Sequence, residues 1–196
     1  CLVSVVALLS MLSLPAFAAD KQIAPRLTMS DTAVVPGDYS RGPAVAFGMG
    51  ARRQSEALPH YLLAWQDGYN GVGGDSNIRG LILDGKGQSV GKPIDICAAK
   101  GVQDSPAAAF ADGVFLVAWS DLRNDKDYDI YAAFVEPNGT VGKEFVISAG
   151  KGGQVFPAVA SDGKGTFLVA WQDHRNGQHY EIMGARVKAD GKVLDP

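Results

Sequence analysis

The chain has 196 residues, of which 46% are hydrophobic, and its formal net charge is −3. This length and hydrophobic content allow a sizeable core, and the absence of a basic stripe argues against nucleic acid as a partner. Twenty-four glycines and ten prolines predict many tight turns, as in an all-β protein.

The N-terminal segment, residues 2–19, carries no charge and is rich in Leu, Val and Ala. It ends in Ala16-Phe17-Ala18, a small-x-small cleavage pattern, so residues 1–19 are interpreted as a secretory signal peptide cleaved near Ala18 or Ala19. A transmembrane anchor is the alternative, but the run is short for one. We therefore expect a secreted or periplasmic protein with no stable membrane insertion after cleavage.

Removal of the signal peptide would leave Cys97 as the one cysteine of the mature chain. An intramolecular disulfide would then be impossible despite the oxidising compartment. Cys97 falls where a later repeat has Ser148, which favours a small strand residue over a nucleophile.

Residues 20–42 are predicted to be a lead-in that contains one outer β-strand. That strand, Arg26–Ser30, alternates apolar and polar residues and is similar to the segments that close the later repeats. It is interpreted as the last strand of a repeat whose beginning is not part of the chain.

A heptad with a central tryptophan occurs three times, as Tyr61–Asp67, Phe115–Asp121 and Phe167–Asp173. The three tryptophans are spaced by 54 residues (65 to 119) and 52 residues (119 to 171), which indicates a repeat architecture. The apolar residues of the heptad are continuous, so we expect a strand covered on both faces.

Three further segments recur around each heptad. A Pro-Ala-rich strand precedes it, a strand of the type Tyr128–Val135 follows it, and a short strand such as Glu144–Ser148 closes the unit. Gly recurs in the turn before the closing strand, and Asn138-Gly139 is one such hairpin signal. Four short antiparallel strands in about 50 residues are typical of one propeller blade.

The sequence therefore predicts an all-β fold, a β-propeller built of four-stranded antiparallel blades. About three blades are expected in residues 43–196, at 43–97, 106–148 and 157–196. Three is below the usual four to eight. We therefore expect a partial propeller: either a fragment, the preferred interpretation, or an arc completed by another chain. The Arg26–Ser30 strand could supply the outer strand that the third unit lacks.

The second unit carries Asp112-Gly113, Asp121-x-Arg123 and Asp129-Ile130-Tyr131, and the third carries Trp171-x-Asp173-x-Arg175 followed by Glu181-Ile182. This pattern resembles the repeats of secreted bacterial β-propellers, and more loosely the TolB-type blade. The resemblance covers roughly residues 43–196 and departs in the first unit, where Tyr69 stands in place of the Arg. It implies a blade type and a periplasmic or extracellular setting, in which such propellers are often binding platforms.

Six residues that follow the tryptophans are candidate ligand-binding residues on a loop-bearing face: Asp67, Tyr69, Asp121, Arg123, Asp173 and Arg175. In one interpretation the Asp-Arg pairs grip an acidic or sugar ligand. In the other, Asp caps turn amides and Arg pairs with Asp129 or Glu181 of the following strand. Repetition in successive units favours the structural interpretation.

Alternating carboxylates at Asp125, Asp127 and Asp129 are a weak candidate for Ca²⁺, because oxygen ligands suit this cation. The segment lacks the Gly and the distal Glu of an EF-hand loop, so a solvated turn is the favoured interpretation. We expect no bound metal and no cofactor.

No catalytic motif accompanies the repeats, so the first functional hypothesis is a non-enzymatic binding module for a protein or carbohydrate ligand. The alternative is a fragment of a glycan-active hydrolase whose catalytic carboxylates lie on blades outside this chain. Assembly with further blades or with a second chain is a third expectation.

Overall fold

The computed structural model describes residues 40–49, 59–68 and 74–195, all of which belong to one compact unit, residues 34–196. The predicted signal peptide and the predicted strand at Arg26–Ser30 lie outside the described residues. Within the described ranges every regular element is a β-strand, and no helix long and apolar enough to cross a membrane occurs among them.

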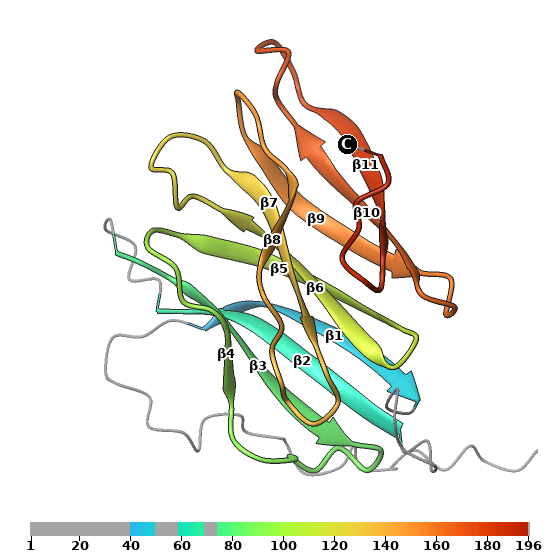
Figure 1. The fold of residues 1–196 in the computed structure, drawn as a ribbon. Helices are drawn as coiled ribbons and strands as arrows, with labels where there is room; N and C mark the ends of the chain where they lie inside the picture. Colours follow the sequence, from blue (N-terminus) through green and yellow to red (C-terminus); the bar gives the residue numbers. More distant parts are fainter. Residues whose placement is uncertain (1–39, 50–58, 69–73, 196) are drawn as a thin grey trace, which may run out of the picture. The chain divides into compact units, whose positions relative to one another are not determined.

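Eleven described strands form three antiparallel sheets that follow one another along the chain (Figure 1). In each sheet the strands pair in sequence order, β1-β2-β3-β4, β5-β6-β7-β8 and β9-β10-β11. The strands are β1 (Arg41–Met49), β2 (Pro59–Asp67), β3 (Asn77–Asp84), β4 (Ile94–Cys97), β5 (Gln103–Ala111), β6 (Val114–Asp121), β7 (Asp129–Val135), β8 (Phe145–Ser148), β9 (Gln154–Ser161), β10 (Thr166–Asp173) and β11 (Glu181–Lys188).

The first strand of each sheet starts earlier than the sequence predicted. Each was expected to begin at its proline, but β1, β5 and β9 begin two or three residues before it. The residue before each proline, Gly42, Ser105 or Phe156, has a φ between 52° and 60°, and the strand pairing shifts register there. The proline therefore sits at a bulge within the strand, a position that does not need its missing N–H.

The heptad strands are the second strands, β2, β6 and β10. The expectation that both faces are covered holds for β6, in which all eight residues are buried. In β2 and β10 buried residues alternate with more exposed ones. The difference arises because β6 belongs to the middle sheet, which has a neighbouring sheet on each side.

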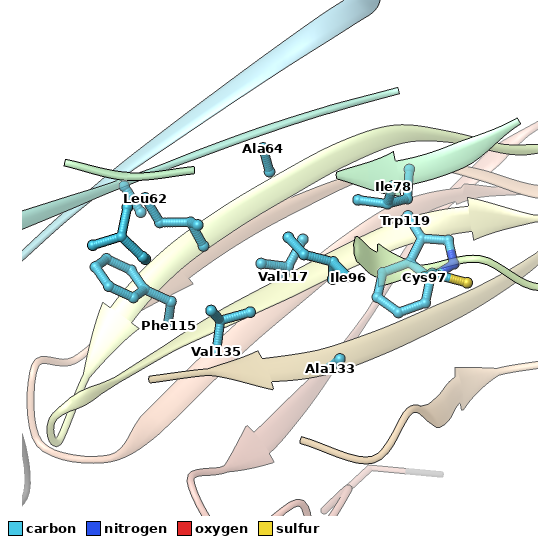
Figure 2. Packing of buried hydrophobic residues seen from close by; sticks show 12 residues of the cluster. Leu62, Ala64, Ile78, Ile96, Cys97, Phe115, Val117, Trp119, Ala133 and Val135 are labelled. Atoms are coloured by element: carbon cyan, nitrogen blue, oxygen red, sulfur yellow. The ribbon is translucent and has the colours of Figure 1, made fainter. Parts of the chain in front are cut away.

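Two hydrophobic clusters join the three sheets. One places Leu62 and Ile78 of the first sheet against Phe115 and Trp119 of the second (Figure 2). The other places Leu116 of the second sheet, with its neighbours, against the third sheet. Two four-stranded antiparallel sheets and a third of three described strands pack face to face in succession, which confirms the predicted fold class, a β-propeller of which about three blades are present.

Candidate functional site at the loop-bearing end

One end of the sheets carries the loops that differ between blades. The start of each first strand pairs with the end of the second strand, as in Arg41 with Gln66, Gln103 with Asp121 and Gln154 with Asp173. Hence the loops after the second strands and the loops before the first strands share one end. We call it the loop-bearing end; its described loop segments are 74–76, 98–102, 122–128, 149–153 and 174–180.

The predicted Asp121-Arg123 pair is a buried structural cluster in the second sheet. The Asp121 carboxylate is fully buried and accepts hydrogen bonds from the Trp119 indole (2.7 Å), the Arg123 backbone N–H (2.9 Å) and the Arg123 guanidinium (2.6 and 2.8 Å). The guanidinium also contacts Glu144 at 2.7 Å and lies over the Tyr131 ring at 3.9 Å.

The Asp173-Arg175 pair repeats this geometry in the third sheet. Asp173 accepts from the Trp171 indole at 2.9 Å and from the Arg175 guanidinium at 2.6 and 2.8 Å. Burial alone raises the pKa of Asp173, but the hydrogen bonds from Arg175 and Trp171 outweigh it and lower the pKa to about 2. Asp173 is therefore held ionised by donors that belong to its own blade.

Each of the two arginines also reaches the outer strand of the preceding blade. Arg123 donates to the Cys97 sulfur at 3.4 Å, and Arg175 donates to the Ser148 hydroxyl at 3.1 Å. Cys97 and Ser148 thus occupy equivalent places, as the sequence predicted. Burial raises the pKa of the Cys97 thiol to about 12, so the neutral thiol persists at physiological pH.

The arginines do not pair with the acidic residues that the sequence interpretation named. Arg123 was expected to pair with Asp129, and Arg175 with Glu181, but the carboxylate partners found are Asp121 with Glu144, and Asp173. The reason is local: the Asp and Arg are two residues apart across one turn, which brings the guanidinium fork directly onto the carboxylate.

In the first sheet, the equivalent aspartate, Asp67, has different hydrogen-bond partners. Asp67 accepts from the Ser40 hydroxyl at 2.9 Å and from Arg79 of β3 at 3.3 Å. Arg79 occupies the place of Tyr131 in the second sheet, so it supplies the cation that the first repeat lacks two residues after its Asp. Tyr69, the remaining predicted ligand residue, lies outside the described residues.

Two of the three carboxylates weighed for Ca²⁺ have partners of their own within the protein. Asp125 pairs with Lys100, whereas Asp129 is buried and accepts from the Asn124 side chain at 3.0 Å and the Gly150 N–H at 3.3 Å. No group of three or more His, Cys, Asp or Glu side chains suited to a metal ion occurs among residues 40–49, 59–68 and 74–195.

A different cluster surrounds Asp104, which the sequence analysis did not single out. Asp104 lies on β5, the first strand of the middle sheet, two residues before the bulge proline. The side chains of Ser105, Ser120 and Tyr128 and the positive charge of Arg41 each lower the pKa of its carboxyl group. Burial nevertheless dominates and raises its pKa above the ordinary value.

The Asp104 cluster draws on all three sheets. Ser120 of β6 also accepts a hydrogen bond from the Phe156 backbone N–H of β9 at 3.1 Å. On the other side, Arg41 of β1 donates to Gln66 at 2.8 Å, and Gln66 donates to Ser76 at 2.9 Å. We call this set the inner-strand site; its members are Arg41, Asp104, Ser105, Ser120, Tyr128 and Phe156.

Phe156 is the exposed aromatic member of the inner-strand site. It is 58% exposed, although it is the residue before the bulge proline and has a φ of 54°. A bulky residue rarely adopts this left-handed conformation, and such strain tends to gather at functional sites. The site thus combines a partly buried carboxylate, a cation, hydroxyl groups and an accessible ring.

The sequence did hold a signal for this site. The positions two residues before the three bulge prolines carry Arg41, Asp104 and Val155, so they differ in every repeat. The prediction that the strands begin at the prolines placed these residues in loops. The structure instead pairs Asp104 with Ser120 of β6, so Asp104 belongs to β5, the innermost strand of its sheet, and not to a loop.

No protein-family model and no curated protein matches the chain. Solved structures with similar folds include a GH43 endo-arabinanase from Bacillus licheniformis, with 12% identity, a TM-score of 0.44 and coverage of 83% of this chain and 59% of that one. An α-L-arabinofuranosidase from Lactobacillus brevis has 13% identity, a TM-score of 0.47 and coverage of 81% and 56%. An exo-1,5-α-L-arabinanase from a bovine ruminal metagenomic library has 14% identity, a TM-score of 0.42 and coverage of 76% and 55%.

The chain spans between 55% and 59% of the length of these three structures. At this identity and TM-score the similarity assigns no activity to this chain.

Proposed function

We propose that this chain is a carbohydrate-binding module that holds its ligand at the loop-bearing end, with Asp104 as the central contact, and that it acts without catalysis. The proposed setting is secreted or periplasmic, which is supported by the signal-like sequence of residues 1–19. The TolB-like pattern of the repeats is in keeping with a binding platform in that setting.

The observation that carries the proposal is the partly buried carboxylate of Asp104 on the innermost strand. Burial raises its pKa, which means that this position disfavours the charged form and that ionising Asp104 costs the fold stability. Groups held at such a cost, within a cluster of polar side chains, gather at functional sites. Asp121, by contrast, is fully occupied by Trp119 and Arg123.

The composition of the inner-strand site favours a neutral, hydroxyl-rich ligand. A carboxylate accepts hydrogen bonds from ligand hydroxyls, and the Arg41 guanidinium can donate to their oxygens. The positive charge of Arg41 already acts on Asp104, so a cationic ligand is a poorer fit. The exposed Phe156 ring offers an apolar surface for the C–H face of a sugar ring.

A glycan hydrolase is the second candidate, favoured by one feature, the raised pKa of Asp104, which suits a general acid. Most glycosidases need a pair of carboxylates that flank the scissile bond. Asp104 is the one acidic residue on β1, β5 and β9, the first strands of the three described sheets. Hydrolysis would need a second carboxylate from outside them, so binding without catalysis has the better support.

The test is retention and hydrolysis of soluble polysaccharides, with arabinan, xylan and a β-glucan as the probes. The purified chain should be retarded by at least one of them in affinity electrophoresis and should release no reducing sugar. Asp104→Asn and Phe156→Ala should each weaken retention about tenfold or more, since each removes a direct contact.

The matched control is Asp125→Asn, which changes an exposed carboxylate at the same end that pairs with Lys100. It should leave retention unchanged. Hydrolysis of any probe that Asp104→Asn abolishes would replace the binding proposal with the hydrolase alternative. Retention that neither Asp104→Asn nor Phe156→Ala weakens would reject the inner-strand site.

A further inference from the structure

The two contacts between neighbouring sheets are formed by the same pair of sheet faces. We name the faces by their second-strand residues: the Trp face carries Trp65, Trp119 or Trp171, and the Leu face carries Leu62, Leu116 or Leu168. In the first cluster the Leu face of sheet one packs on the Trp face of sheet two, and in the second cluster the Leu face of sheet two packs on the Trp face of sheet three.

The Leu face of the third sheet has the same apolar positions but lies open. Leu168 is 52% exposed, whereas the equivalent Leu62 and Leu116 are fully buried. Ile182 is 75% exposed, whereas the equivalent Ile78 and Ile130 are fully buried. The residues that form the internal interfaces are therefore repeated here without the surface that covers them elsewhere.

The Trp face of the first sheet is open in the complementary way. Val45 is 65% exposed and Phe47 is 50% exposed, whereas their equivalents Ala108 and Phe110 pack against the first core cluster. A shallow depression of about 370 Å³ lies on this face, lined by Val45, Tyr61, Leu63, Leu83 and residues 85–87. Apolar side chains of a partner could enter it.

We propose that the open Leu face of one chain packs on the open Trp face of a second copy of the chain, head to tail. The chain carries both halves of an interface that it already forms twice internally, so a second copy supplies the matching surface without new chemistry. The contact joins two different faces, so it is heterologous and each face can be blocked separately.

One departure makes this contact weaker than the internal ones. Arg186 pairs with Leu168 on the open Leu face, where the first two sheets have Ile82 and Phe134. Its guanidinium is paired with Asp195 at 2.8 Å, so the charge is balanced at that edge. The apolar part of the contact is thus centred on Leu168, Ala170 and Ile182.

The experiment is sedimentation velocity of the purified chain over a range of micromolar concentrations. Association should increase with concentration, and Ile182→Asp or Val45→Asp should each weaken it at least about tenfold, because each buries an unpaired charge. Both positions are exposed, so the variants should keep the wild-type circular dichroism. Val146→Asp, an exposed β8 position of the middle sheet and so outside the two open faces, is the matched control and should not weaken association.

Mixing the two variants tests the head-to-tail geometry. Ile182→Asp keeps an intact Trp face and Val45→Asp keeps an intact Leu face, so the mixture should form a one-to-one dimer at concentrations at which each variant alone is monomeric. A wild-type chain that stays monomeric, or a mixture that does not dimerise, would overturn the proposal. Association that survives Ile182→Asp would also do so.

Discussion

Two carboxylates of the middle sheet, Asp121 and Asp104, lie at the same end of adjacent strands. They differ in that only Asp121 has an equivalent in the other two sheets. Asp121 recurs as Asp173 and as Asp67, and its donors Trp119 and Arg123 recur in the third blade. Asp104 does not recur, since Arg41 and Val155 hold its equivalent positions. The comparison indicates that the repeated polar residues build the scaffold, whereas the unrepeated Asp104 is the residue that we propose to contact a ligand.

The tryptophans give the largest expected effect and test whether repetition means burial. Trp119 is fully buried between two sheets, so Trp119→Ala should lower the free energy of unfolding by about 3–5 kcal/mol. Trp65, which is only half-buried on the open face of the first sheet, should cost clearly less when replaced by Ala. Urea unfolding of both variants measures this, and equal losses would refute the placement of Trp119 between blades.

Substitutions in the Asp-Arg cluster should give the next largest loss of unfolding free energy. Asp121→Ala leaves the Trp119 N–H and the Arg123 guanidinium without their buried partner, which should cost about 3 kcal/mol of stability. Asp67→Ala should cost about 1 kcal/mol, because the Asp67 carboxylate is partly exposed and its pair with Arg79 is longer. Chemical denaturation of the two variants compares a complete cluster with an incomplete one.

Asp173 and Asp104 should affect stability in acid in opposite directions, because their pKa shifts have opposite signs. The lowered pKa of Asp173 stabilises the fold above the unfolded pKa, near 3.8, and this contribution of about 2 kcal/mol is lost as the pH falls toward 2. The raised pKa of Asp104 favours the fold below pH 3.8 and disfavours it as the pH rises through the folded value.

Unfolding midpoints of the wild type, Asp173→Asn and Asp104→Asn between pH 2 and 7 measure the two contributions. Asp173→Asn should flatten the loss of stability in acid. Asp104→Asn should leave the midpoint at pH 7 unchanged or raised. Parallel pH profiles for all three proteins would contradict the assignment of opposite shifts.

The smallest effects concern Cys97, which lies where the second blade has Ser148. Because burial raises the pKa of its thiol to about 12, the folded chain should react with a thiol reagent at pH 8 only as fast as it opens. Cys97→Ser copies Ser148, whose hydroxyl accepts from Arg175, so stability should change by about 1 kcal/mol or less. Rapid labelling of the native protein would show that the outer strand of the first blade is not packed.

Much of this fold could be predicted from the sequence because the repeat is strong. The Trp heptads, the closing strands and the turn at Asn138-Gly139 all appear where expected, since each depends on local periodicity or turn chemistry. The pairing of Arg123 with Glu144 could not be predicted, because it depends on how a loop folds back toward β8.

The inner-strand site could not be predicted for a similar reason. The surroundings of Asp104 include Arg41 of the first sheet and Ser120 of its own sheet, and Ser120 accepts a hydrogen bond from the Phe156 backbone N–H of the third sheet. A bulge that no local rule predicts sets the register that turns Asp104 toward them, since the residue before a proline normally avoids the left-handed conformation.

The most direct test of the central claim compares Asp104→Asn with Asp121→Asn, by measuring polysaccharide retention and thermal unfolding on each variant. We predict a crossover: Asp104→Asn loses retention and keeps or raises the unfolding midpoint, whereas Asp121→Asn lowers the midpoint and retains the ligand below it. The opposite outcome, with Asp104→Asn unfolding early and retention unaffected in the folded protein, would contradict the account.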